Sequence, residues 1–376
     1  MDRSGHQQST MSLLLNDGTP PARQVGFAVV GLGDRGANLL RVLADNLDAH
    51  VRWICDIDSS RLAKYRRRHP DARVTTRVDR ILADPSVDAV VLATPVDTRY
   101  DLGMRVLEAG KHVFIETPVA MCADLADDLA IVARAENRIV TCGHTCLYSS
   151  PVRAVKRMIR SGTLGDIYCV SSTRANLGLD HGVTNVIWDL GPHEFSILLY
   201  WLGEMPTGIQ AVGRDSVVQG VADVAYVTMS FDSGIVVNVE LSWRAPSRLC
   251  RTVVVGTERM VVYEDAGPEP VRLFDCGVGA EPMRPGFGES HFARPSGDIV
   301  SPNIESTEPL DSQLSDFIQA IRDGDSMEYH TTLARSVVRI AEAADESLRL
   351  GGTRVVVPAG RHATTQIAPR RATAAV

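Results

Sequence analysis

The segment Val25-Gly26-Phe27-Ala28-Val29-Val30-Gly31-Leu32-Gly33-Asp34-Arg35-Gly36 is the most informative part of this 376-residue chain. It begins as a continuous apolar run, which is typical of a strand buried on both faces of a parallel sheet. It ends with the spacing Gly-x-Gly-x-x-Gly and leads into helical spacing over Ala37–Leu47. In this setting Gly31 makes a tight turn, Gly33 lets a pyrophosphate approach the backbone, and Gly36 lets the helix pack on the strand.

A second apolar run, Val51–Cys55, ends in Asp56, where a dinucleotide-binding fold carries an acidic residue. A carboxylate there would accept hydrogen bonds from both ribose hydroxyls and repel a 2′-phosphate, so NAD is favoured over NADP. Arg61 lies close enough in the sequence to keep NADP as an alternative. Asp34 and Arg35 open the first helix, whose unsatisfied N–H groups would face the phosphates.

Strands and helices then alternate as far as Cys142, a pattern that predicts a doubly wound parallel sheet. The run Val87–Ala93 is followed by Thr94 and Pro95, and the next strand ends in Glu116. Open α/β sheets bind ligands at the carboxyl ends of their strands. We therefore expect Thr94 and Pro95 to lie beside the cofactor and Glu116 to contact its ribose, unless Glu116 only caps the following helix.

Beyond about Pro151 the pattern changes to period-two alternation, with Ala222–Phe231 and Ile235–Trp243 joined by a hairpin-type turn. This half is expected to be α+β, with a mostly antiparallel, open-faced sheet. Residues 275–309 are rich in Gly, Pro and Ser and predict a long loop. The expected organisation is a flexible leader (1–24), a dinucleotide-binding Rossmann domain (25–146), an α+β substrate and oligomerisation domain (147–358) and a flexible tail (359–376).

Composition and charge exclude several classes of protein. The chain has 39 Lys and Arg against 46 Asp and Glu, and this net charge of −7 argues against nucleic-acid binding. No apolar run reaches the ~18 residues of a membrane span, and residues 1–23 lack the apolar core of a secretory signal. Seven scattered cysteines fit free thiols in a reducing cytoplasm. Cys142, His144 and Cys146 lie close together, but no second ligand pair follows, so we expect no metal site.

The strongest catalytic candidates lie in Trp188-Asp189-Leu190-Gly191-Pro192-His193-Glu194. Proline favours the first helical turn, so this segment is expected to open a helix over Phe195–Leu202. At the helix N-terminus the dipole would keep His193 neutral and suited to accept a proton near pH 7. Asp189 would orient its ring. The alternative is an aspartate that caps the helix beside a structural histidine.

Several further residues are candidates for contact with a substrate. Polar side chains that could bind hydroxyl groups lie just upstream of the catalytic segment, at Arg174, Asn176, His181 and Asn185. Trp188 and Tyr148 complete the set, and Tyr148 or Thr117 would relay a proton to His193.

Together these motifs resemble the glucose–fructose oxidoreductase / inositol dehydrogenase / MocA family over roughly residues 25–358. The resemblance rests on Gly31–Gly36 after a strand, Asp56, Thr94-Pro95, Ala109–Val113 before Glu116-x-Pro118, Gly143-His144-Thr145, Asp189-x-x-x-His193 and the ending Ala341–Gly352. It implies NAD(P)-dependent oxidation of a secondary alcohol on a sugar, amino sugar or cyclitol, or the reverse reduction, with His144 beside the cofactor. It also implies a homodimer or homotetramer formed through the C-terminal sheet. The segments 174–178 and 188–193 look most like a branch linked to nucleotide-sugar or glycan biosynthesis.

One position departs from the family pattern. The family motif Glu-Lys-Pro is Glu116-Thr117-Pro118 here, and in the family the lysine handles the hydroxyl proton together with the Asp and the His. A threonine does not titrate near pH 7 and carries no positive charge. Removal of a general acid–base residue costs ~10²–10⁴-fold in rate.

Three interpretations remain open because of this substitution. In the first, His193 is the acid–base residue and the protein is a dehydrogenase or ketoreductase. In the second, NAD is reduced and reoxidised within one turnover, so that elimination, epimerisation or glycoside cleavage proceeds without net redox change. In the third, the protein binds the cofactor without catalysis.

Overall fold

The computed structural model describes residues 23–177, 184–265, 267–278 and 297–357. Most of the expected leader, the expected tail and the candidate His181 lie outside the described residues. All seven cysteines lie within them and are free thiols, as the sequence predicts. In the described ranges, no helix combines the length and the apolar character that crossing a bilayer requires.

The first sheet is parallel throughout, and its strand order is β3-β2-β1-β4-β5-β6. Its strands are β1 (Val25–Val30), β2 (Ala49–Cys55), β3 (Arg73–Thr75), β4 (Ala89–Leu92), β5 (His112–Ile115) and β6 (Val140–Cys142). The helices that connect them are α1 (Asp34–Asp45), α2 (Ser59–Arg68), α3 (Asp79–Leu82), α4 (Val96–Glu108) and α5 (Ala123–Ala135). The chain order reverses between β1 and β4, which is where such sheets bind ligands. The doubly wound sheet predicted from the sequence is confirmed.

The second sheet has nine strands in the order β14-β13-β12-β11-β7-β10-β9-β8-β15. They are β7 (Ile167–Leu177), β8 (Gly208–Arg214), β9 (Val224–Ser230), β10 (Val236–Ser242), β11 (Arg244–Gly256), β12 (Met260–Glu264), β13 (Val271–Phe274), β14 (Ile299–Val300) and β15 (Val355–Val356). All neighbours are antiparallel except β7 and β10. The α+β class is therefore also confirmed, although β14 lies within the residues expected to form a loop.

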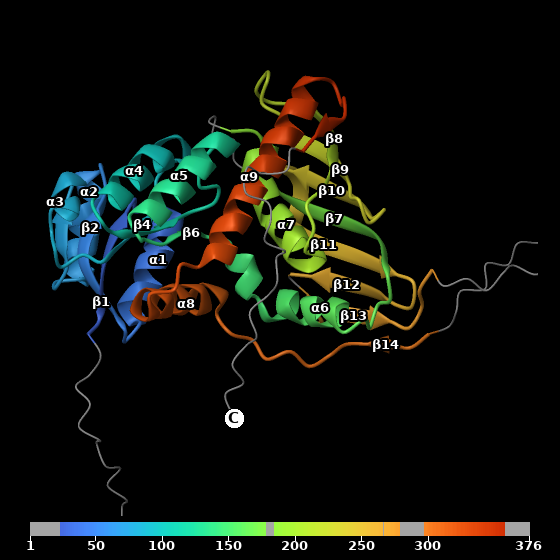
Figure 1. Cartoon of the computed structure of the whole chain (residues 1–376), viewed down its shortest axis with the longest axis horizontal. Helices are drawn as coiled ribbons and strands as arrows, with labels where there is room; N and C mark the ends of the chain where they lie inside the picture. The colour runs from blue at the N-terminus through green and yellow to red at the C-terminus, as the bar shows by residue number, and fades with distance from the viewer. Residues whose placement is uncertain (1–22, 178–183, 266, 279–296, 358–376) are drawn as a thin grey trace, which may run out of the picture.

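Helices cover one face of this second sheet (Figure 1). They are α6 (Ser150–Arg160), α7 (Val186–Leu202) and α9 (Glu328–Arg349), and the short 3₁₀ helix η1 (Thr145–Tyr148) links α6 to the first sheet. Burial alternates along β10, where Val237 and Val239 are buried and Val236 and Asn238 are exposed. The buried set faces the helices, so the opposite face of the sheet is open.

Helix α8 (Pro309–Asp323) returns to the first sheet although it follows the second in the sequence. Phe317 is fully buried, and its ring centroid lies 6.1 Å from that of Phe27 and 6.0 Å from that of Phe114. In Figure 1, α8 lies beside α1, and α9 runs between the two halves of the molecule. The core of the dinucleotide-binding half is thus completed by residues from the end of the chain.

We expect Phe317→Ala to lower the free energy of unfolding by about 3–5 kcal/mol, because it leaves a cavity between the two other rings. Gln319→Ala changes an exposed residue of the same helix and should cost less than about 0.5 kcal/mol. Denaturant-induced unfolding measures both values. Equal values for the two variants would contradict this account of how α8 is held.

Candidate cofactor and active site

The glycine turn between β1 and α1 has the geometry of a phosphate cradle. Gly31 has φ +90°, and a Cβ there would lie 2.6 Å from the carbonyl oxygen of Ala93. A Cβ on Gly36 would lie 1.8 Å from the carbonyl oxygen of Gly31, so α1 packs directly on the turn. A Cβ on Gly33 would meet nothing within 4 Å, and no side chain caps α1. Open space beside free helical N–H groups fits a bound pyrophosphate.

Asp56 lies at the end of β2 and is almost fully buried. Its Oδ2 accepts a hydrogen bond from the N–H of Leu32 at 2.7 Å, and its Oδ1 accepts one from the N–H of Asp58 at 2.8 Å. Arg61 Nη1 lies 3.6 Å from Asp56 Oδ2. The carboxylate therefore braces the glycine turn and stands where the adenosine ribose of a dinucleotide is expected.

Glu116 brings a second buried carboxyl group to the carboxyl end of β5. It lies against Gly143, where a Cβ would come within 3.1 Å of Glu116 Oε2. Burial raises the pKa of Glu116, although the charges of Arg35 and Arg99 act in the opposite direction. Its Oε2 accepts a hydrogen bond from the N–H of Thr117 at 3.3 Å. Since it makes no ion pair in the described part of the chain, its Oε1 remains available to a ligand.

Arg99 braces the carboxyl edge of the first sheet, a contribution that the sequence interpretation missed. Its Nη1 donates to the carbonyl oxygens of Glu116 and Pro118, each at 3.0 Å, and its Nε donates to Thr94 O at 2.9 Å. It thereby ties together the segments that follow β4 and β5, with Pro95 at the start of α4. An arginine inside a helix gives no sequence signal for this bracing role.

Two buried polar atoms near this edge, Thr117 Oγ1 and His144 Nε2, are inaccessible to solvent. Neither makes a hydrogen bond with any residue in the described ranges. Burial lowers the pKa of His144 to about 3, and His330 contributes in the same direction. His144 is therefore neutral at physiological pH, and it also lowers the pKa of the neighbouring His193.

The expected start of the catalytic helix is wrong. Helix α7 begins at Val186, and Asn185 caps it by accepting hydrogen bonds from the N–H groups of Ile187 (3.0 Å) and Trp188 (3.3 Å). Pro192 therefore lies inside the helix rather than in its first turn. His193 lies too far along α7 for the helix dipole to set its charge.

His193 is nevertheless held neutral. Burial lowers the pKa of His193 well below its usual range, and the charges of Arg174 and Arg35 lower it further. The hydrogen bond expected between Asp189 and the imidazole is not found. Instead Asp189 is exposed, and its Oδ2 accepts a hydrogen bond from Trp243 Nε1 at 2.8 Å. The two side chains are one turn apart but directed to different partners.

The residues expected to contact a substrate fall into two groups. Arg174 and Asn176 lie on the same face of β7 as Ser172, whose hydroxyl donates to Glu194 of α7, and Arg174 acts electrostatically on His193. Tyr148, in contrast, donates its hydroxyl to Asp316 Oδ2 at 2.5 Å and is engaged within the protein. This contact differs from the expected role in binding substrate or relaying protons.

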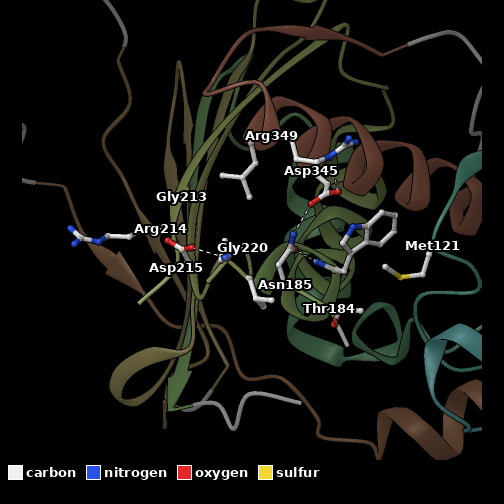
Figure 2. Close-up of a pocket in the computed structure, with 13 residues that line it drawn as sticks. Met121, Thr184, Asn185, Gly213, Arg214, Asp215, Gly220, Asp345 and Arg349 are labelled. Atoms are coloured by element: carbon white, nitrogen blue, oxygen red, sulfur yellow. Dashed lines mark hydrogen bonds and ion pairs between the residues drawn. The ribbon is translucent and has the colours of Figure 1, made fainter. Parts of the chain in front are cut away.

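Asn185 and Trp188 form the second group and line a cavity of about 470 Å³ between α7, α9 and the end of β8. Figure 2 shows Asn185 directed at Asp345 of α9, and its Nδ2 donates to Asp345 Oδ1 at 2.6 Å. Both ends of the amide are therefore used inside the protein. The cavity does not include His193, Arg174 or Asn176.

No group of three or more His, Cys, Asp or Glu residues is arranged to hold a metal ion in the described ranges. Cys142 is fully buried, and burial raises its pKa above the usual range of a thiol. Cys146 Sγ lies 3.4 Å from Ser196 Oγ. These thiols lie in the protein interior as packing groups.

Two family models match this chain. The model described as "Oxidoreductase family, NAD-binding Rossmann fold" covers residues 25–144, and the GFO/IDH/MocA C-terminal domain covers residues 152–262. The chain belongs to the GFO/IDH/MocA family. Its N-terminal half is accordingly an NAD-binding Rossmann domain, in agreement with the glycine cradle and Asp56.

Individual members of the GFO/IDH/MocA family are similar at moderate identity. A scyllo-inositol 2-dehydrogenase (NADP(+)), IolW, of Bacillus subtilis is 29% identical over 196 residues, which are 50% of this chain and 54% of that protein. A 2,7-anhydro-N-acetylneuraminate hydratase of Mediterraneibacter gnavus is 26% identical over 56% of this chain and 59% of its own length. The alignments thus span little more than half of these relatives. The crystal structure of GenD2 from gentamicin A biosynthesis in complex with NAD is 25% identical, with a TM-score of 0.76 over 92% of this chain and 100% of that one.

The glycine cradle gives a matched pair of variants. We expect Gly33→Ala to fold normally, because its Cβ enters open space, but to weaken NAD binding at least tenfold (about 1.4 kcal/mol) by obstructing the pyrophosphate. Gly36→Ala should instead destabilise the fold, because its Cβ would overlap the carbonyl oxygen of Gly31. Calorimetric titration with NAD and thermal unfolding separate the two effects. Unchanged NAD affinity in Gly33→Ala would show that the pyrophosphate binds elsewhere.

Proposed function

We propose that this protein oxidises a secondary alcohol of a sugar, amino sugar, nucleotide sugar or cyclitol with NAD, or carries out the reverse reduction. The observation that carries the proposal is a neutral imidazole, His193, which has no hydrogen-bond partner for its ring among the described residues and comes from the second half of an NAD-binding family fold. It acts electrostatically with Arg35 of the cradle helix and His144 of the first sheet. NADP is the alternative cofactor, since Arg61 stands beside Asp56.

The residues divide the chemistry between them. NAD, when bound, would supply the acceptor for the hydride of the reacting carbon. His193 accepts the hydroxyl proton in oxidation and returns it in reduction, a role that suits an imidazole whose basic form is present at neutral pH. Asp189 is exposed one turn earlier on α7, with one oxygen held by Trp243, and we assign it to a substrate hydroxyl. Glu116 is assigned to the ribose near the nicotinamide.

A second candidate function is a reaction without net redox change, through transient oxidation next to an acidified C–H bond. Two observations favour it: Thr117 replaces the family lysine, and one relative is named as a hydratase. The non-catalytic interpretation requires NAD binding without turnover.

A substrate panel separates these functions. With NAD and a series of sugars, nucleotide sugars and cyclitols, a dehydrogenase produces a rise in absorbance at 340 nm, a non-redox enzyme forms product without it, and a binding protein does neither.

His193→Asn should lower kcat at least ~100-fold and leave NAD affinity within about twofold. An active His193→Asn variant would remove His193 from the mechanism.

The low pKa of His193 also predicts the pH profile. An ordinary imidazole with a pKa near 6.5 would be half protonated, and half inactive as a base, at about pH 6.5. Because the pKa of His193 lies lower, we expect kcat/KM for oxidation to change less than about twofold between pH 8 and 6.5. Activity should be lost only as the pH falls further. Initial rates across this range, at constant ionic strength, provide the measurement.

We also propose that the open face of the second sheet joins two copies of the chain. It carries exposed Tyr226 (53% exposed), Val236 and Val212 on β9, β10 and β8, between polar residues such as Asn238. An apolar, helix-free sheet face is a surface that proteins commonly cover by association.

Tyr226→Arg should convert the wild-type dimer or tetramer to a monomer of 40.8 kDa, because it places a charge in the middle of that face. Ile131→Arg changes an equally exposed apolar residue on α5 and should leave the assembly intact. Light scattering after size-exclusion chromatography measures the mass. A monomeric wild-type protein would refute the proposed assembly.

A further inference from the structure

Behind the candidate active site lies a buried ion pair that the proposed mechanism has not used. Glu194 follows His193 on α7 and is 0% exposed. Its Oε1 accepts a hydrogen bond from Arg174 Nε at 2.5 Å, and its Oε2 accepts one from the hydroxyl of Ser172. Ser172 Oγ in turn lies 2.8 Å from Thr252 Oγ1. A carboxylate with no access to water is stable only with such partners, so this network fixes Arg174 in one place.

Arg174 uses only one of its five N–H donors in this ion pair. Nε is bound to Glu194, whereas the two terminal amino groups make no hydrogen bond in the described part of the chain. The side chain remains 16% exposed. A guanidinium held by its Nε presents a rigid, permanently charged fork on the other side. Asn176, two residues further along the same strand face, has a buried Oδ1 that finds no hydrogen-bond partner among the described residues.

Three arginines act electrostatically on His193, and Arg174 has the largest effect among them. Arg35 belongs to the first turn of α1, where the cofactor phosphates are expected. Arg248 is largely exposed and is paired with Asp265. Because Arg174 is bonded to Glu194, the residue next to His193 on α7, we assign it as the positive charge beside the acid–base residue. The lysine position of the family holds Thr117, an uncharged side chain whose buried Oγ1 makes no hydrogen bond within the described residues.

We propose that Arg174, positioned by Glu194, donates hydrogen bonds to the reacting oxygen of the substrate and so supplies the positive charge that the family places at residue 117. This inference rests on the proposed function. When the hydroxyl proton passes to His193 and the hydride leaves the carbon, the oxygen carries developing negative charge until the C=O bond is formed. A preorganised cationic donor stabilises that charge, and in the reverse direction it polarises the carbonyl group. Glu194 acts through Arg174 and is a positioning residue.

The decisive variant is the double substitution Arg174→Met/Glu194→Gln, because removal of Arg174 alone would leave a buried, unpaired carboxylate and could unfold the protein. We expect kcat to fall ~10²–10³-fold, the range seen when one donor to a developing oxyanion is lost, with NAD affinity within about twofold. Arg272→Met/Glu264→Gln is the matched control. It removes the same residue types from an ion pair between β12 and β13 of the second sheet, joined at 2.7 Å, and kcat should stay within about threefold.

A lysine placed at residue 117 tests whether catalysis needs the positive charge of Arg174 or only its structural contacts. If Arg174 replaces the lysine, adding Thr117→Lys to the double variant should raise kcat at least tenfold, whereas Thr117→Lys in the wild type should change it little. Added guanidinium at millimolar concentration should also restore part of the activity of the double variant and none in the control. In Glu194→Gln alone, kcat should fall while KM changes less than about threefold.

Two outcomes overturn different statements. If the wild type turns over a substrate and the double variant does so at a similar rate, or if Thr117→Lys has the same effect in both backgrounds, Arg174 has no such role while the proposed function stands. If the wild type binds NAD but converts nothing in the substrate panel, the proposed function fails and this inference fails with it. Thermal unfolding of every variant identifies any loss that comes from misfolding.

Discussion

The packing of α8 and α9 against the first sheet is the interaction on which the candidate site depends. The site takes Thr117 and His144 from one half of the molecule and Arg174 and His193 from the other. Phe317 of α8 lies between two phenylalanines of the first sheet, and Thr331 of α9 donates its hydroxyl to Val140 O of β6 at 2.8 Å. On the same helix, Arg335 and Arg339 both pair with Asp127 of α5. These contacts make the two sheets one packed body, so that groups far apart in the sequence keep a fixed separation.

Much of the first half was predictable from the sequence because its signals are local. The glycine spacing, the apolar run before it and the acidic end of β2 each fix a neighbouring piece of backbone, and together they gave the correct sheet. The packing of α8 against the first sheet could not be predicted in this way. Its amphipathic pattern indicates a buried face but not the residues that this face contacts. Phe317 and Phe27 are brought together only by the tertiary fold.

The sequence predicts which residues belong to the candidate site better than it predicts the partners that those residues contact. Pro192 was interpreted as a helix start, although Asn185 is the residue that caps α7. The sequence contained this cap signal, but it was assigned to substrate binding. The hydrogen-bond partner of Asp189 is Trp243, which lies between β10 and β11. No sequence pattern links these two positions. A glutamate in a helix is usually solvated, so the sequence carries no sign that Glu194 is enclosed, and only the fold shows it.

In the mechanism that we propose, the site separates two electrostatic tasks. Its imidazoles are kept uncharged by enclosure, which preserves them as proton acceptors, and its fixed positive charge belongs to a group that does not titrate in water. A lysine could serve both purposes, but its charge would depend on its surroundings. With the tasks divided between His193 and Arg174, the proton acceptor and the charge can be adjusted by different neighbouring residues.

The two edge strands of the second sheet, β14 and β15, are each only two residues long. Such short borders offer few free N–H and C=O groups to a neighbouring chain, so lateral growth into a continuous ribbon is disfavoured. Association through the open face of the sheet stops at a pair, because a two-fold pair covers that face on both copies. In the assembly that we propose, the architecture thus favours closed particles over fibres.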